Sequence, residues 1–122
     1  MALIRDELMA GVRVILFDTD KLLDMVEIEK CYQEIVAILS KTQEHNVLLH
    51  FGRVKFMSSA ALGMLIRVLK KCKEYKVMLK LCNISPEEYE VFQITGMNKI
   101  FDIQQDAAQA MEAFKKSFAG PR

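Results

Sequence analysis

The sequence predicts an α/β fold in which a mixed, mostly parallel sheet of four to five strands packs against about four helices. Short apolar segments alternate with longer segments whose apolar residues recur every three to four positions, and this alternation is typical of parallel sheets with helical crossovers. No repeat, linker or low-complexity tract divides the 122 residues, and an apolar content of 52% is sufficient to fill one core. We therefore expect a single domain over residues 1–122.

The first third of the chain predicts two strands and a helix. Residues 1–10 include an edge strand, residues 11–17 form a buried strand, and residues 18–21 form the turn after it. A helix then begins near Asp24 and ends near Thr42. Its predicted inward stripe consists of Met25, Ile28, Tyr32, Ile35 and Leu39.

The middle of the chain predicts a central strand, a second amphipathic helix and another strand. Residues 46–51 are mostly apolar, as expected of a strand covered on both faces. A helix follows from Ser58 to Tyr75, and residues 77–82 form the next strand. The packed face of this helix is predicted to carry Leu62, Leu65, Ile66, Leu69 and Cys72.

The last third predicts two more helices around a short strand. Pro86 suits the first turn of a helix, and Gly96 supplies its end. Residues 100–103 are expected to form a short strand, Asp106 is expected to cap the last helix, and residues 119–122 are expected to be a frayed tail. The stripe of the last helix comprises Ala107, Ala110, Met111, Phe114 and Phe118, and its exposed part is a candidate homodimer surface.

Composition disfavours several classes of protein. No apolar run approaches the roughly 18 residues of a membrane-spanning helix, and the N-terminus lacks the features of a secretory leader, so a cytoplasmic location is expected. The three cysteines form no Cys-x-x-Cys pair and are interpreted as buried free thiols. His45 and His50 have no clustered carboxylates nearby. We expect neither a metal nor a cofactor.

Charge is unevenly distributed along the chain although its formal net value is only +1. Residues 53–80 contain eight lysines and arginines against Glu74 alone, whereas residues 18–34 are acidic. This predicts two faces of opposite sign that steer a protein partner, unless the lysines serve only as a solvated surface. The near-neutral pI and the absence of interleaved aromatic residues argue against nucleic-acid binding.

The most informative segment is the serine pair Ser58–Ser59, which follows the short apolar segment 54–57 and opens a helix. A serine at this position can accept a hydrogen bond from a first-turn N–H group, or its hydroxyl can be exposed to a modifying enzyme. A phosphoryl group on Ser59 would be stabilised by the helix N-terminus and would add about −1.5 to −2 charges. The structural alternative is that Ser58 is simply the cap and Ser59 fills the first turn.

Three ordered motifs resemble the STAS family, the sulfate-transporter and anti-sigma-factor-antagonist domain. Residues 58–63 read Ser-Ser-Ala-Ala-Leu-Gly and resemble the family's phosphorylation loop, whose usual pattern is Asp-Ser-Ser-Gly-Leu-Gly. Residues 77–86 resemble its next strand and loop, and residues 91–97 resemble its Leu-x-x-Thr-Gly-Leu helix ending. Residues 101–103 match the short last strand. The resemblance covers about residues 10–118.

The resemblance implies an anti-sigma factor antagonist that acts by partner switching. Such a protein binds an anti-sigma factor of the GHKL-type serine kinase class and is released when that kinase phosphorylates its serine. Alignment of the loop places the acceptor at Ser59, with Ser58 as the alternative. The partner-binding residues implied by the loop are Met57, Ser58, Ser59, Ala60, Ala61 and Met64.

Departures from the family pattern keep a second function open. The usual aspartate before the acceptor is replaced by Ser58, the glycine after the serines is replaced by Ala61, and the acidic residue that closes the preceding strand is replaced by His50. Loss of the carboxylate favours a constitutive adaptor, an unphosphorylated subunit of a signalling scaffold or transporter complex. An enzyme is not expected, because Gly-x-Ser-x-Gly is absent and only His45 and His50 could serve as a histidine base.

Overall fold

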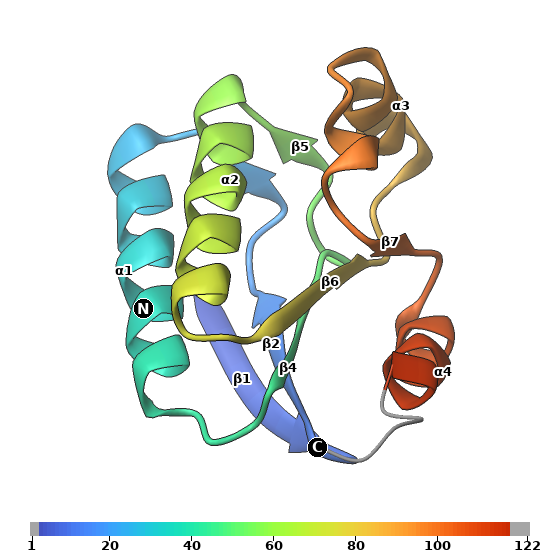
Figure 1. Ribbon diagram of the computed structural model, residues 1–122. Coiled ribbons are helices and arrows are strands. Elements are labelled where there is room, and N and C mark those ends of the chain that lie inside the picture. The colour runs from blue at the N-terminus through green and yellow to red at the C-terminus, as the bar shows by residue number, and fades with distance from the viewer. Residues whose placement is uncertain (1–2, 118–122) are drawn as a thin grey trace.

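The computed structural model describes residues 3–117 and contains the predicted mixed, mostly parallel sheet (Figure 1). Its five strands lie in the order β1-β2-β4-β6-β7, with β1 antiparallel to β2 and every other neighbouring pair parallel. The predicted edge strand is therefore confirmed as β1. The strands are β1 (Ile4–Met9), β2 (Val12–Phe17), β4 (Asn46–His50), β6 (Met78–Cys82) and β7 (Ile103–Gln104).

Four α-helices pack on this sheet, three on one face and one on the other (Figure 1). They are α1 (Met25–Lys41), α2 (Ser59–Glu74), α3 (Pro86–Ile94) and α4 (Ala107–Ser117), with a 3₁₀ turn, η1 (Met97–Lys99), after α3. The helices α1, α2 and α3 share one face, and α4 covers the other. A separate parallel pair of two-residue strands, β3 (Lys21–Leu22) and β5 (Phe56–Met57), lies beside the start of α2.

The core has two parts that meet at the central strand β4. Val47 and Leu49 belong to the large cluster under α1, α2 and α3, where the rings of Phe17 and Phe51 lie 4.9 Å apart. Leu48 points to the smaller cluster under α4. The prediction that this strand is covered on both faces is therefore confirmed.

Polar side chains cap all four helices. Asp24, Ser58, Ser85 and Asp106 each accept a hydrogen bond from the backbone N–H three residues further along. Pro86 occupies the first turn of α3, and Gly96 adopts a φ of 76° just after that helix ends. The predicted roles of Pro86, Gly96 and Asp106 are confirmed.

Several expected boundaries and burials are wrong. The predicted strand 100–103 begins only at Ile103, because the chain leaves Gly96 through η1 and Ile100 stays exposed. Met25 is also exposed, since the buried face of α1 begins at Ile28. Lys21 is not a turn residue, because it pairs with Phe56 in the β3–β5 ladder.

The C-terminal stripe is only partly a surface feature. Ala110 and Phe114 are buried against the sheet, and Met111 is half-buried beside them, so these residues hold α4 to its own domain. Phe118 and the expected tail at 119–122 lie outside the described residues.

The predicted buried free thiols are confirmed for Cys31, Cys72 and Cys82. Burial raises the pKa of the Cys72 and Cys82 thiols to about 12, which keeps both protonated at neutral pH. Within residues 3–117, no helix is both long enough and apolar enough to cross a membrane.

Several hydrogen bonds hold the connection from β4 to β5 in place. The Gly52 N–H donates to His50 Nδ1 at 3.1 Å, the Phe51 N–H donates to the Cys82 carbonyl at 3.0 Å, and the Lys55 N–H donates to the Asp20 carbonyl at 2.8 Å. A Cβ atom on Gly52 would lie 2.6 Å from His50 Cε1, so any larger residue here would displace the His50 ring. These contacts fix the path of the chain toward Ser58.

A buried ammonium group helps to attach α4 to the sheet. The Lys80 side chain is almost fully buried on β6, where it donates a hydrogen bond to the Asp102 carboxylate. Its Nζ lies 5.0 Å from the centroid of the Phe114 ring on α4. The pair thus joins β6, the segment before β7 and α4.

Stability should depend on His50 at mildly acidic pH. Burial lowers the pKa of His50 in the folded protein, although the nearby Glu7 carboxylate acts in the opposite direction. In the unfolded chain a histidine has a pKa of about 6.5. The unfolded chain therefore takes up a proton that the folded chain resists, and the free energy of unfolding should fall as the pH is lowered from about 7 to about 5.5. His50→Asn retains an acceptor but cannot titrate, so it should flatten this dependence in urea unfolding. Equal slopes for the two proteins would contradict the prediction.

Removal of one partner of the Lys80–Asp102 pair should cost more than removal of both. Asp102→Ala leaves a buried ammonium without its carboxylate and should lower the free energy of unfolding by about 1–3 kcal/mol. Adding Lys80→Met should restore most of that loss, because an apolar side chain can pack against Phe114 without a partner. Denaturant unfolding of the three proteins tests this, and a double variant no more stable than Asp102→Ala would count against it.

Candidate functional site

Ser58 is held in place by both its side chain and its backbone. Its Oγ accepts a hydrogen bond from the Ala61 N–H at 3.3 Å, and its carbonyl accepts the first helical bond from the Leu62 N–H at 3.2 Å. Its own N–H donates to the Leu22 carbonyl of β3 at 3.0 Å. The hydroxyl of Ser58 is therefore occupied as the N-cap of α2.

Ser59 has a different environment although it is the next residue. It is the first residue of α2 and is exposed, and its hydroxyl makes no hydrogen bond within the part of the chain that the structure describes. The first turn of α2 has no acidic side chain, so nothing on the helix itself opposes the positive end of its dipole. A phosphoryl group on this hydroxyl would meet free N–H groups and solvent.

The other predicted partner-binding residues divide into two groups. Met57 and Ala60 are half-buried and remain at the surface beside the serines. Ala61 and Met64 are fully buried, so their predicted place in an exposed partner surface is wrong. They lie on the side of α2 that packs onto the sheet together with Leu65, because the helical repeat brings positions 61, 64 and 65 to one face.

The structure brings a different set of apolar residues to this end of the molecule. Four exposed side chains come from the segment before α1, the first turn of α1 and β5: Leu23, Met25, Val26 and Phe56. Sequence reasoning missed them as surface residues. One signal was available, since Val26 lies outside the predicted apolar stripe of α1 and has no reason to be apolar if that face is solvated.

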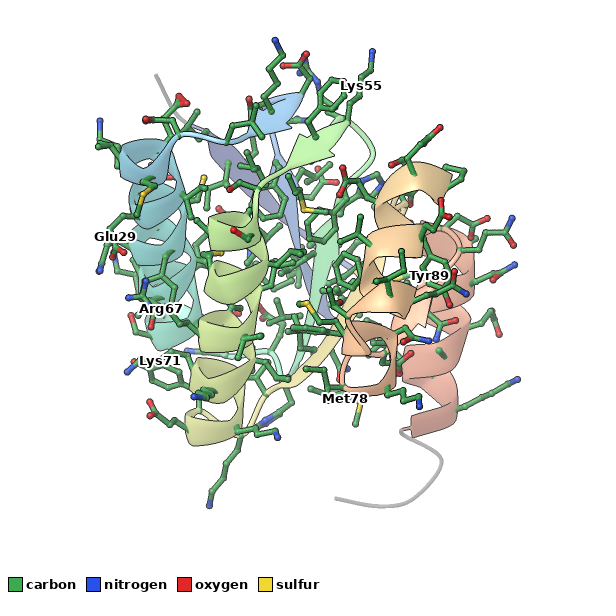
Figure 2. The ribbon with its side chains drawn as sticks, turned by 90° about the horizontal axis from the view of Figure 1, so that it is seen from above. Glu29, Lys55, Arg67, Lys71, Met78 and Tyr89 are labelled. Atoms are coloured by element: carbon green, nitrogen blue, oxygen red, sulfur yellow. The ribbon has the colours of Figure 1, made fainter. Side chains whose placement is uncertain are left out.

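The expected separation of charge into two faces is only partly realised. The Arg67 guanidinium lies 2.9 Å from the Glu29 carboxylate and 3.8 Å from the Tyr32 ring centroid, so it bridges α2 to α1 (Figure 2). This ion pair lowers the pKa of the Glu29 carboxyl. Arg53 pairs with Asp18 at 3.2 Å, and Lys80 is buried. The exposed basic residues that remain are mainly the lysines near the end of α2.

Within residues 3–117, neither histidine forms a hydrogen bond with Ser58 or Ser59, as the base of a serine nucleophile would. His50 Nδ1 accepts from the Gly52 N–H, and His45 is exposed before β4. Among residues 3–117, no three His, Cys, Asp or Glu side chains are grouped as metal ligands.

Comparisons with known proteins identify the family. The family model described as "STAS domain" matches residues 9–110. A candidate anti-sigma factor antagonist, BtrV of Bordetella bronchiseptica, is 34% identical over 87 residues, which span 71% of this chain and 74% of that protein.

Solved structures show the same fold. An anti-sigma-factor antagonist (STAS) domain protein from Planctomyces limnophilus superposes with a TM-score of 0.80 at 29% identity, covering 93% of this chain and 98% of the other. A candidate anti-sigma factor antagonist from Thermotoga maritima has a TM-score of 0.77 at 18% identity, with 90% and 92% covered, which supports the fold alone. The serine loop, the mixed sheet and the family match over residues 9–110 together establish that this chain belongs to the STAS domain family.

Proposed function

We propose that this protein is an anti-sigma factor antagonist that works by partner switching. In its unmodified form it binds an anti-sigma factor that is also a GHKL-type serine kinase, and phosphorylation at Ser59 releases that partner. The observation that supports this proposal most is the Ser59 hydroxyl at the start of α2, which is exposed and makes no hydrogen bond within residues 3–117. The neighbouring Ser58 is already used as the cap. The names of the relatives from Bordetella bronchiseptica and Planctomyces limnophilus support the same role. Such a regulator of transcription would act in the cytoplasm.

The choice between the two serines follows from the cost of modifying each. Phosphorylation of Ser58 would turn the Oγ that accepts from the Ala61 N–H into a phosphoester oxygen, a weaker acceptor, whereas the exposed Ser59 hydroxyl has no such bond to lose. Serine and aspartate are comparable N-caps, so Ser58 can cap α2 without the charge that the family's usual aspartate would bring. Ser59 is therefore the proposed acceptor and Ser58 a structural neighbour.

Release of the partner follows from electrostatics without a change of fold. The phosphate adds about −1.5 to −2 charges at a point that the partner would cover, where desolvation makes the charge costly. The unpaired N–H groups of the first turn and the positive end of the α2 dipole would stabilise the phosphate in the free protein. Both effects favour the dissociated state.

The constitutive adaptor remains the second candidate, because the acidic residue before the acceptor is absent at Ser58. If a kinase needs that carboxylate to recognise the loop, the same surface would bind a partner without ever being modified. The two functions differ in whether phosphate is found on Ser59 and in whether Ser59→Asp changes partner binding.

Affinity capture from host lysate distinguishes these functions. With wild type, Ser59→Ala and Ser59→Asp as baits, mass spectrometry should identify a GHKL-type kinase on the first two and not on the third, with phosphate on Ser59 of the wild-type bait. With the purified kinase, Ser59→Asp should raise the Kd by roughly tenfold or more. The same partners on all three baits, with no phosphate, would favour the adaptor.

The two serines should separate stability from regulation. Ser58→Ala removes the cap of α2 and should lower the free energy of unfolding by about 1 kcal/mol, while phosphate is still incorporated at Ser59. Ser59→Ala should leave the free energy of unfolding nearly unchanged and abolish phosphorylation. Denaturant unfolding and phosphosite mapping after incubation with the kinase and ATP measure both effects. Phosphate retained on Ser59→Ala but lost on Ser58→Ala would reverse the assignment.

A further inference from the structure

Four apolar side chains next to the serine loop are exposed: Leu23, Met25, Val26 and Phe56, hereafter the N-terminal patch. Their exposed fractions lie between 49% and 73%. A single exposed apolar residue needs no explanation, but several on adjoining segments are typical of an interaction surface.

The β3–β5 ladder places two of these residues on one side. Lys21 pairs with Phe56, and Leu22 pairs with Met57, so Phe56 lies on the same side of the ladder as Lys21. Leu22 is buried, and the alternation of side chains turns both Lys21 and Leu23 outward. Phe56 and Leu23 are both exposed, and each is close in sequence to the hydrogen bond between the Ser58 N–H and the Leu22 carbonyl.

The patch continues into a groove along α1. Met25 and Val26 form one end of a shallow groove, wide open to solvent, on the exposed side of α1, and the remaining lining residues are Glu29, Lys30, Gln33 and Glu34. The helices α1 and α2 lie side by side and start at the same end of the molecule (Figure 1). The groove and Ser59 are thus accessible to one partner approaching that end.

The charged residues around the groove indicate which side chains a partner would need there. From its cap through its third turn, α1 carries four carboxylates, those of Asp24, Glu27, Glu29 and Glu34, against the single ammonium of Lys30. One oxygen of Glu34 is buried and has no hydrogen-bond partner among residues 3–117. Glu29 is already paired with Arg67, and Asp24 is used as the cap of α1. Glu27 and the second carboxylate oxygen of Glu34 can accept from a partner's lysine or arginine.

Resting on the function proposed above, we infer that the anti-sigma factor docks on the N-terminal patch as well as on the serine loop. It places an apolar side chain against Met25 and Val26 and basic side chains near the carboxylates of Glu27 and Glu34. A second copy of this chain fits less well, because a two-fold contact at the patch would bring the carboxylates of two α1 helices together. The patch supplies affinity away from Ser59, so phosphorylation can act on one part of a larger contact.

The test is a titration of the purified kinase-type anti-sigma factor that the Ser59→Ala bait retains. Four proteins are compared with wild type: Ser59→Asp, Met25→Ser/Val26→Ser, the double change combined with Ser59→Asp, and the matched control Ile94→Ser/Ile100→Ser. The two control residues are exposed by 79% and 53% but lie on and just after the α3–η1 segment. Thermal unfolding of each variant confirms that it remains folded.

The patch variant should raise the Kd roughly tenfold, and the control should change it less than about twofold. In the combined variant the two effects should multiply, because the sites are separate. An effect of Ser59→Asp without an effect of the patch variant would overturn the patch and leave the proposed function standing. Equal losses for the patch and control variants would also overturn it.

Failure of the proposed function has a different signature. If no kinase-type anti-sigma factor binds wild type, the function and the docking inference fail together. Sedimentation velocity of the free protein tests whether a second copy of this chain occupies the patch. If wild type is a dimer and Met25→Ser/Val26→Ser is a monomer, the patch is a dimer interface and the inference is overturned.

Discussion

Burial of β4 on both faces is the constraint on which the position of the serine loop depends. Val47 and Leu49 fill the larger cluster and Leu48 the smaller one, so the strand cannot shift register without exposing one set. The chain that leaves β4 must therefore emerge at one edge of the sheet. There the Phe51 N–H bonds to the end of β6 and the Lys55 N–H bonds to Asp20, and Ser58 is delivered to the start of α2.

At the start of α2, one hydrogen bond distinguishes the hydroxyls of Ser58 and Ser59. Ser58 accepts from the Ala61 N–H and completes the helix, and Ser59 is left at the surface. Serine at position 58 therefore caps the helix without the charge that an aspartate would bring. The backbone of α2 uses only one of the two serines as its cap, and that serine is Ser58.

The surface around the loop is built from segments that are distant in the sequence. The β3–β5 ladder brings residues 21–22 beside residues 56–57, and the Arg67–Glu29 ion pair stacks over Tyr32 to join α1 and α2. Arg67 of α2 thereby neutralises part of the acidic region. What remains exposed beside Ser59 is an apolar patch flanked by carboxylates of α1 and by Lys21 and Lys55 of the β3–β5 segment, and this mixture limits the kind of protein that can cover it.

The sequence by itself determined the alternation of strands and helices, the caps at Asp106 and Ser58, the stop at Gly96 and the family of the serine loop, because these features depend on local periodicity and backbone preference. Only the tertiary structure decided that Ala61 and Met64 face the core and that Met25 and Val26 do not. An apolar residue at a helix start is compatible with either place, and its burial depends on whether the sheet extends beneath it. Ion pairs such as Arg67–Glu29 were equally out of reach, since they join residues 38 positions apart through the packing of two helices.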